Sequence, residues 1–156
     1  MMGRTHLAIG LLAALLLLAF VPYQQRVAFT LLVLLGSILP DVDAEGSTIN
    51  KRVPVTRWIP FLFEHRGFFH SIYPLVLIMA VAALAGGWQY GLYISIGYLT
   101  HLASDALTHA GIRPMHPLSK FHVKGFLSTG GILEYLLFVA VAAIDILLGI
   151  KMGIMV

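Results

Sequence analysis

The sequence predicts an all-α fold, namely a polytopic membrane bundle of about five transmembrane helices with one polar interfacial loop. Hydrophobic residues make up 59% of the 156 residues and charged residues only 11%, and the mean hydropathy is +0.90. A soluble domain of this length carries about twice that proportion of charge. Five apolar runs separated by polar or turn-forming residues complete the pattern, and the length suits a single domain over residues 1–156.

The first two apolar runs predict helices over residues 4–23 and 27–39. The first run is close to the roughly 20 residues that a helix needs to cross a bilayer. No small-x-small cleavage motif follows it, so we expect a retained helix rather than a signal peptide. The second run is short and ends at Pro40, so its helix is expected to tilt or to lie where the bilayer thins.

The one long polar segment of the chain contains residues 53–63, which combine apolar and basic side chains. Trp58, Phe61 and Phe63 alternate there with Arg57 and two prolines. Proline opposes a regular spanning helix, whereas aromatic side chains favour headgroup depth. We therefore expect this segment to lie in the membrane interface.

The remaining three apolar runs predict helices over residues 72–84, 88–109 and 132–150. Gly86 and Gly87 provide a tight turn between the first two of them, because glycine adopts backbone conformations that other residues avoid. A proline- and glycine-rich loop follows the fourth helix, and no internal repeat interrupts this simple order.

Three ionisable residues near the end of the fourth helix recur every four positions: His101, Asp105 and His109. Four helical residues turn about 400°, so the three side chains drift only about 80° around the axis and share one face. An ionisable group beside a membrane-length apolar run is costly unless it is paired, ligated or hydrated. This spacing therefore favours a divalent metal site. His109, His116 and His122 are weaker candidates for ligands, because they suit loop positions.

Five crossings place the N-terminus and the loops after the second and fourth helices on one side of the membrane. The ionisable residues near those helix ends therefore meet at one face: His6, Asp41, Asp43, His65, His70, His101, Asp105, His109 and Glu134. With no cysteine in the chain, a metal there uses imidazole, carboxylate or water. A site of two or three divalent ions can bind phosphate, generate hydroxide at neutral pH and stabilise a leaving oxygen.

Each of these residues also has a simpler interpretation. Asp41 and Asp43 suit a turn after a proline, and Glu134 suits the positive end of the fifth helix. His6 suits an ordinary surface position. Asp145 lies on the far side of the fifth helix, and a structural partner such as Arg26 explains it better than catalysis.

Four motifs occur in order along nearly the whole chain: Thr5-His6, Gly36-Ser-Ile-Leu-Pro-Asp-Val-Asp43, His65-Arg-Gly-Phe-Phe-His-Ser71 and Gly97-Tyr-Leu-Thr-His-Leu-Ala-Ser-Asp105. Together they resemble the family of LexA-regulated, membrane-bound metal-dependent hydrolases. That family is similar to zinc-dependent phospholipase C and P1-type nucleases, which are helical phosphoesterases with clustered zinc ions and a His-x-x-x-Asp step.

The resemblance implies Asp41, His70, His101 and Asp105 as metal ligands, with His6 and Asp43 next. The soluble enzymes also use a late His-x-x-x-Glu step, whereas Gly130 stands four residues before Glu134 here. One to three ions are therefore expected, with zinc as the first choice and manganese as the second.

These observations lead us to expect a membrane-bound metal-dependent hydrolase, a phosphoesterase for a lipid phosphate or another amphiphilic phosphodiester. The expected metal ligands are His6, Asp41, His70, His101, Asp105 and Glu134. The expected catalytic residues are Asp43, His65 and Arg66, because a guanidinium pairs with phosphate oxygens. The expected partners are membrane lipid and a phosphate-containing substrate. No nucleic-acid partner is expected, because basic loops of a membrane protein explain the pI of 9.4.

Three other functions compete with this hypothesis. An intramembrane metalloprotease is disfavoured because the chain has no His-Glu-x-x-His motif. A metal or proton transporter places its ionisable groups near the bilayer midplane on broken helices. The predicted cluster instead lies at one face of the membrane. The third alternative is a membrane protein with a structural metal.

Basic residues predict the orientation in an inner, plasma-type membrane. Eight of the ten fall on the side of the N-terminus: Arg4, Lys51, Arg52, Arg57, Arg66, Arg113, Lys120 and Lys124. The positive-inside rule places that side, and with it the expected site, at the cytoplasmic face.

Overall fold

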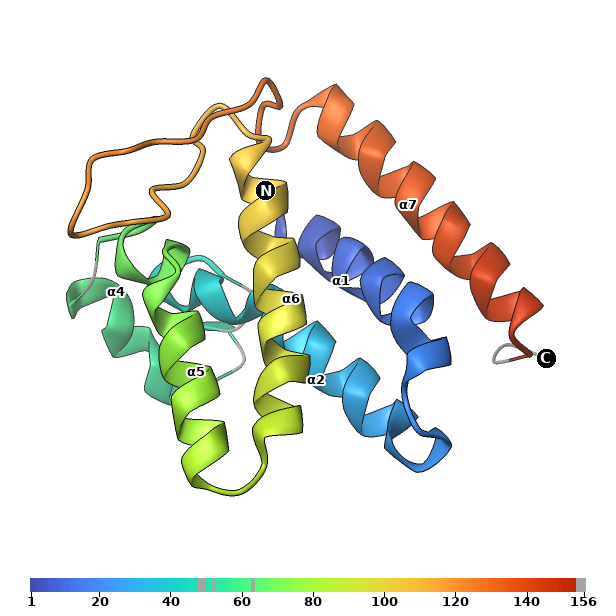
Figure 1. The fold of residues 1–156 in the computed structure, drawn as a ribbon. Coiled ribbons are helices and arrows are strands. Elements are labelled where there is room, and N and C mark those ends of the chain that lie inside the picture. The colour runs from blue at the N-terminus through green and yellow to red at the C-terminus, as the bar shows by residue number, and fades with distance from the viewer. Residues whose placement is uncertain (48–49, 52, 63, 154–156) are drawn as a thin grey trace.

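The computed structural model describes residues 1–47, 50–51, 53–62 and 64–153, and over these residues it is helical (Figure 1). The long helices are α1 (Gly3–Leu17), α2 (Arg26–Ile38), α5 (Tyr73–Leu84), α6 (Trp88–Ala106) and α7 (Ile132–Lys151). The part of the chain that is described forms no strand, only two isolated bridges. The predicted all-α class is confirmed, and the long helices lie at the five predicted positions.

Three helical stretches among the described residues are long and apolar enough to cross a membrane: Gly3–Phe20, Tyr23–Asp43 and Ile132–Lys151. The first two include the short 3₁₀ turns that extend α1 and α2. Helix α5 is apolar but has only 12 residues. Helix α6 has 19 residues and carries polar side chains along its length. A membrane helical bundle is thus confirmed, and three of the five expected crossings meet both criteria.

Helix α6 stands at the centre of the bundle and packs against α1, α2 and α5 (Figure 1). Helix α1 also packs against α2 and α7. Apolar side chains from α1, α2 and α6 form one core cluster, which includes Ala14, Phe29, Val33 and Tyr93. This packing brings the start of α1, the end of α2 and the last turns of α6 into one region.

Two glycines allow α2 and α6 to cross at very short distance. A Cβ atom on Gly97 would lie 1.9 Å from the Val33 carbonyl oxygen, and one on Gly36 would lie 2.1 Å from the Ile94 carbonyl oxygen. Any other residue would push the two backbones apart, because helices in membranes approach closely only through small residues. The crossing places the backbone of Ser37 against the last turns of α6.

Helix α6 ends at Ala106, so the expected helix over residues 88–109 is three residues too long. The His109 backbone N–H donates to the Leu127 carbonyl oxygen, and the His109 side chain is exposed. His109 therefore does not share the helical face of His101 and Asp105, and that expectation is wrong. The backbone turns away because the loop pairs with residues 123–127 through bridges at Thr108 and Ile112.

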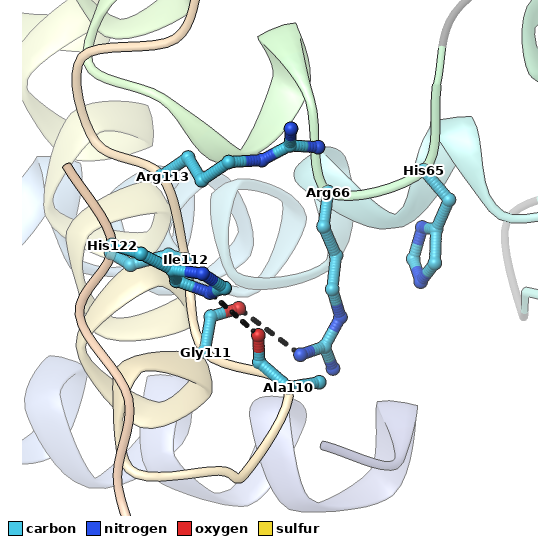
Figure 2. Close-up of a pocket in the computed structure, with 7 residues that line it drawn as sticks. All are labelled: His65, Arg66, Ala110, Gly111, Ile112, Arg113 and His122. Atoms are coloured by element: carbon cyan, nitrogen blue, oxygen red, sulfur yellow. Dashed lines mark hydrogen bonds between the residues drawn. The ribbon is translucent and has the colours of Figure 1, made fainter. Parts of the chain in front are cut away.

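A cavity of about 270 Å³ lies between this loop and the segment that precedes α5 (Figure 2). Its lining includes His65 and Arg66 on one side and Gly111, Arg113 and His122 on the other. The polar segment before it contains a 3₁₀ helix, Pro54–Trp58, and the short helix α4, Ile59–Leu62.

Two aromatic side chains of this polar segment are exposed. Trp58 and Phe61 are 73% and 74% exposed. Phe63, which was expected to join them, lies outside the described residues. The interfacial location of the segment stays a prediction.

Candidate metal centre

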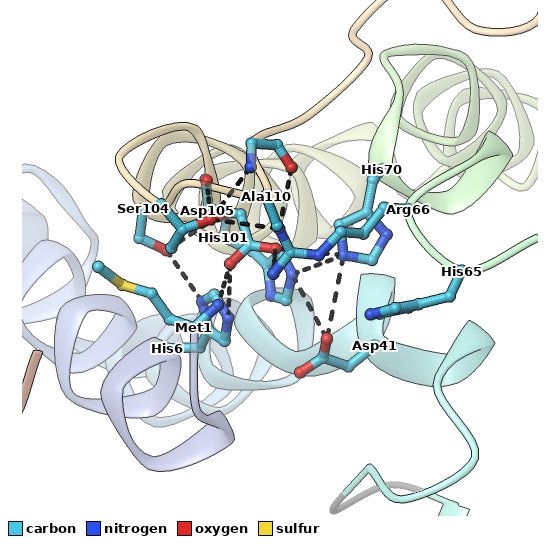
Figure 3. A network of polar contacts seen from close by, with 12 residues as sticks. Met1, His6, Asp41, His65, Arg66, His70, His101, Ser104, Asp105 and Ala110 are labelled. Carbon is cyan, nitrogen blue, oxygen red and sulfur yellow. Dashed lines mark hydrogen bonds and ion pairs between the residues drawn. The ribbon is translucent and has the colours of Figure 1, made fainter. Parts of the chain in front are cut away.

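Side chains from four parts of the chain converge beside the last turns of α6 (Figure 3). His6 comes from α1, and Asp41 and Asp43 come from the 3₁₀ helix Leu39–Asp43 that continues α2. His70 ends the 3₁₀ helix Phe68–His70, and His101 and Asp105 belong to α6. All of them except Asp41 are buried. The structure thus brings together residues that are up to 99 positions apart in sequence.

The Nδ1 atoms of three imidazoles face hydrogen-bond acceptors behind the site. His101 Nδ1 lies 2.8 Å from the Ser37 carbonyl oxygen, and His70 Nδ1 lies 3.1 Å from Asp43 Oδ2. Both acceptors lack a proton to give, so we assign the proton to Nδ1 in each ring. The geometry of such pairs leaves Nε2 with a lone pair directed into the site.

His6 follows the same rule through a hydroxyl group. Its Nδ1 lies 2.9 Å from Ser104 Oγ, and that hydroxyl donates its own proton to the His101 carbonyl oxygen at 2.9 Å. Ser104 therefore accepts from His6, and we assign the His6 proton to Nδ1 as well. One serine fixes the tautomer of His6 and ties it to the turn that carries His101.

The three Nε2 atoms face one another and the carboxylates at short range. His101 Nε2 lies 3.3 Å from His70 Nε2, and His6 Nε2 lies 3.4 Å from Asp105 Oδ1. His70 Nε2 lies 3.6 Å from Asp105 Oδ2. His6 Nε2 is buried and has no hydrogen-bond partner. A buried polar atom without a partner is costly, and nitrogen and carboxylate lone pairs so arranged fit a divalent cation between them.

The ligand atoms form three groups within which they lie no more than 4.8 Å apart. One holds His6, His101 and Asp105; the second holds Asp41, His70 and His101; the third holds Asp43, His65 and His70. His101 is shared by the first two, but its Nδ1 is engaged by Ser37, so only Nε2 is left for one ion. If two ions were held, His101 would serve one of them, and the other would depend on the remaining members of its group.

Hydrogen bonds to Asp43 account for the third group. Asp43 Oδ1 lies 2.7 Å from His65 Nδ1, and Oδ2 accepts from the Arg66 backbone N–H at 3.1 Å as well as from His70. Both oxygens of this buried carboxylate are thus engaged. Asp43 thus lies behind the His70 ring and holds it with Nε2 toward Asp41 and Asp105.

Arg66 is held at both its backbone and its side chain. It adopts a left-handed conformation with φ of 62°, which is uncommon for a residue with a side chain. Its Nη2 lies 3.1 Å from Asp105 Oδ2, and its Nη1 donates to Thr108 Oγ1 and to the Gly111 carbonyl oxygen. The guanidinium therefore neutralises charge on a candidate metal ligand, a contact that the sequence did not predict.

Glu134, expected as a ligand, lies outside the three groups. Its Oε1 accepts from the Met2 backbone N–H at 2.6 Å and from Thr5 Oγ1 at 2.9 Å, and its Oε2 accepts from the Gly130 backbone N–H at 2.6 Å. Glu134 thus fastens the first turn of α1, next to His6, to the start of α7. The Met1 amino group forms an ion pair with Asp105.

A second cavity, of about 460 Å³, opens over the centre. Its lining includes Asp41 and the basic side chains of Arg4, Lys51 and Arg66. The Asp41 side chain is 16% exposed, whereas those of His6, His70, His101 and Asp105 are at most 1% exposed. The exposed edge of the candidate centre is therefore Asp41, and the opening above it is lined with cationic side chains.

Two other ionisable groups of the loop lie to one side of the centre. Arg113 Nη2 donates to Glu64 Oε1 at 2.7 Å, and this hydrogen bond holds the pKa of the exposed Glu64 carboxyl below its usual range. His122 Nε2 lies 2.8 Å from the Ala110 carbonyl oxygen. The two contacts fix both side chains at the edge of the smaller cavity.

Sequence reasoning missed the parts of the centre that hold the imidazoles from behind. Ser104 lies three residues after His101 in the motif of residues 97–105, and a hydroxyl at this helical spacing can bond to the His101 carbonyl oxygen. This spacing was the signal in the sequence that could have indicated its contact with His6. The Ser37 carbonyl oxygen has no side-chain signature, although its neighbour Gly36 marks a close backbone approach. Arg26, suggested as a partner of Asp145, instead contacts the Val21 carbonyl oxygen and the Tyr23 ring.

Comparison with known proteins places the chain among inner membrane proteins. It is 32% identical over 93 residues to the "Inner membrane protein YdjM" of Escherichia coli (strain K12), and equally to that of Shigella flexneri. The match covers 54% of this chain and 46% of each relative, so it spans about half the length of these relatives. No solved structure matches the chain. The family profile of the YdjM inner membrane protein matches residues 1–155, and the chain therefore belongs to the YdjM inner membrane protein family.

Proposed function

We propose that this protein is a metal-dependent phosphoesterase of the inner membrane, acting on a lipid phosphate or amphiphilic phosphodiester at the membrane surface. The observation that carries the proposal is the convergence of the Nε2 atoms of His6, His70 and His101 on Asp41 and Asp105, with every Nδ1 engaged behind them. The resemblance of its motifs to LexA-regulated hydrolases, and through them to zinc-dependent phospholipase C, supports the same chemistry.

The residues that would hold divalent metal are His6, His101 and Asp105 for one ion, with Asp41 and His70 for a second. Zinc suits this set of nitrogen and oxygen ligands best, and manganese is the alternative. When bound, such ions supply Lewis-acid polarisation of a phosphoryl group and activation of water at neutral pH.

The protein's own side chains would then bind and orient the substrate. Arg66, Arg4 and Lys51 line the opening over Asp41, where a phosphate would pair with their cations. Asp43 keeps the imidazole of His70 in position, and His65, whose ring is 48% exposed, stands where a proton could be passed to a leaving oxygen.

Metal content and phosphoesterase activity test the proposal together. Protein reconstituted in lipid nanodiscs should contain zinc or manganese by mass spectrometry. It should release phosphate from phosphatidic acid or cleave bis(p-nitrophenyl) phosphate, and a chelator should abolish that activity. Protein that takes up no metal on titration and shows no chelator-sensitive cleavage would remove the basis of the proposal.

Arg66 separates substrate binding from metal binding. Arg66→Ala should retain the metal and lose activity, because the arginine has no lone pair for a metal but stabilises phosphate charge. Lys120→Ala, which removes an exposed cation of the later loop, serves as the matched control and should change neither. Loss of metal from Arg66→Ala would show instead that its pairing with Asp105 is needed to assemble the centre.

We further propose that the centre faces the cytoplasm. The basic side chains around it support this orientation under the positive-inside rule. The order of helices also supports a shared side for residues 44–72 and 107–131, because α5 and α6 enter and return as a hairpin. Arg52, one of the eight basic residues counted, lies outside the described residues.

Single cysteines test the orientation, since the chain has none of its own. A cysteine at Ser47 should react only with a membrane-permeant thiol reagent in intact cells. A cysteine at Gly87, in the turn between α5 and α6, should react with an impermeant reagent. The reverse pattern would place the centre on the outer face and change the available substrates.

A further inference from the structure

We propose that the smaller cavity beside Arg66 is a second anion-binding subsite, and that the substrate is an amphiphile with two linked phosphoryl groups. The terminal phosphoryl group would lie at the metal centre and the phosphoryl group attached to the lipid would lie in the cavity. This inference rests on the proposed phosphoesterase function and adds the class of substrate to it.

The cavity has the chemistry of an anion site. Four basic side chains line it, namely His65, Arg66, Arg113 and His122 (Figure 2). None of the described residues in its lining carries a carboxylate. Its volume of about 270 Å³ is several times the share of roughly 30 Å³ that one water molecule takes in the liquid, so a phosphoryl group fits with water beside it. A cationic headgroup would be repelled here, whereas an anion could accept further hydrogen bonds from the two arginines, beside those that they already donate to Asp105 and Glu64.

Arg66 joins this cavity to the metal centre. One edge of its guanidinium lies 3.1 Å from Asp105 Oδ2, and the same residue lines both the cavity of about 270 Å³ and the larger one over Asp41. A guanidinium has five N–H donors, and the contacts to Asp105, Thr108 and Gly111 use three of them. His65 likewise lines both cavities. Two adjacent phosphoryl groups, one in each cavity, would thus both lie beside the Arg66 guanidinium and the His65 ring.

Arg113 is the residue that distinguishes the second subsite from the first. It lines the smaller cavity but not the larger one, and it is held at the edge by Glu64 at 2.7 Å. Its remaining donors are available to an anion, since only one N–H contacts Glu64. Its removal should therefore weaken the hold on a second phosphoryl group and leave the first unaffected.

The reaction that follows is hydrolysis of a phosphoanhydride. Water attacks the terminal phosphorus, and the bond from that phosphorus to the bridging oxygen breaks. The bridging oxygen leaves with the lipid-linked phosphoryl group. The two protons of the water are divided between the products and the solvent. The products are inorganic phosphate and a lipid monophosphate, and no oxidant or further reactant is required.

Two phosphonates that cannot be hydrolysed test the second subsite directly. Titration of the metal-loaded full chain in nanodiscs should show methylenediphosphonate binding at least about tenfold tighter than methylphosphonate, as expected for added charge-assisted hydrogen bonds. Arg113→Gln should remove most of that advantage while metal content and methylphosphonate affinity stay unchanged. Lys120→Gln, the control in the same loop, should keep the advantage.

A second measurement compares two hydrolysable substrates that carry the same farnesyl chain. Phosphate release from farnesyl diphosphate should exceed that from farnesyl monophosphate in kcat/KM, and Arg113→Gln should reduce the difference. An advantage for the diphosphonate that survives Arg113→Gln would assign it to the metal alone and overturn the second subsite. The absence of metal and of binding by either phosphonate would instead overturn the proposed function itself.

Discussion

Asp105 on α6 and Asp145 on α7 are both buried acidic residues of long helices, yet their surroundings differ completely. Asp105 is 1% exposed and meets the Met1 amino group, His6, His70 and Arg66. Asp145 is 4% exposed, and its Oδ1 has no hydrogen-bond partner. Burial alone therefore does not distinguish the two carboxyl groups, whereas the convergence of partners from distant segments on Asp105 does.

The physical basis of the difference is how each helix is packed. Helix α6 is surrounded by α1, α2 and α5, so a side chain on it can be reached from several directions. Helix α7 packs mainly on α1, and much of its remaining surface is exposed apolar side chain. A buried charge is tolerated where opposite charges and hydrogen bonds offset its desolvation, and such partners surround Asp105 but not Asp145 Oδ1.

The largest effect is expected at Asp105. Asp105→Asn keeps the shape of the side chain but removes the charge that faces His6 and His70. We expect metal affinity to fall by more than the roughly 10- to 100-fold that loss of an outer partner costs. Metal titration followed by equilibrium dialysis measures this, and retention of wild-type affinity would end the assignment of Asp105 as a ligand.

The next largest loss of metal affinity is expected at Ser104, which belongs to none of the three ligand groups. Ser104→Ala removes the acceptor that fixes the tautomer of His6, so metal affinity should fall about 10- to 100-fold. Ser104→Thr keeps the hydroxyl group and should restore most of the affinity. If the alanine and threonine variants bind metal equally, the hydroxyl does not orient His6.

The third effect acts through packing. Gly97→Ala places a methyl group against the Val33 carbonyl oxygen, and overpacking of this kind costs about 1–3 kcal/mol of stability. Thermal unfolding in detergent should show a lower midpoint, with only a few-fold loss of metal affinity. Gly130→Ala is the control, because it adds a methyl group where nothing lies within 4 Å. Since Gly130 has a φ of 75°, this variant measures the cost of backbone strain in the absence of a steric clash.

The smallest effect is expected at Asp145, the residue compared with Asp105 above. Asp145→Asn should leave metal content and phosphoesterase activity within experimental error of the wild type, because no member of the three ligand groups is Asp145. If this variant alone abolished function while Asp105→Asn was tolerated, an ion or proton path through the membrane would replace the hydrolase hypothesis.

The sequence predicted the elements well because apolar runs of membrane length leave few alternatives. Helices begin within one residue of the predicted start in all five cases, as at Trp88 and Ile132. The end of α6 was misplaced because His109 continues a four-residue spacing that the backbone does not follow. Local periodicity carries no information about the pairing of residues 107–112 with the later strand-like segment.

The candidate site was predictable in part. Placement of helix ends on one membrane face was enough to group His6, Asp41, His70, His101 and Asp105. It could not reveal that Glu134 is engaged by Met2, Thr5 and Gly130, because a carboxylate that binds metal and one that accepts N–H groups look alike in sequence. Nor could it reveal the Ser37 carbonyl oxygen, since every residue has one.

The crossing at Gly36 and Gly97 also links the site to the membrane around it. The same short contact that packs α2 on α6 holds the Ser37 carbonyl oxygen 2.8 Å from His101 Nδ1. The spanning stretch Tyr23–Asp43, which contains α2, has 21 residues, and a spanning segment longer than the hydrocarbon core of the bilayer adjusts to it by tilting. A change in that tilt would move the Ser37 carbonyl oxygen relative to His101, so this crossing couples the geometry of the candidate centre to the thickness of the surrounding bilayer.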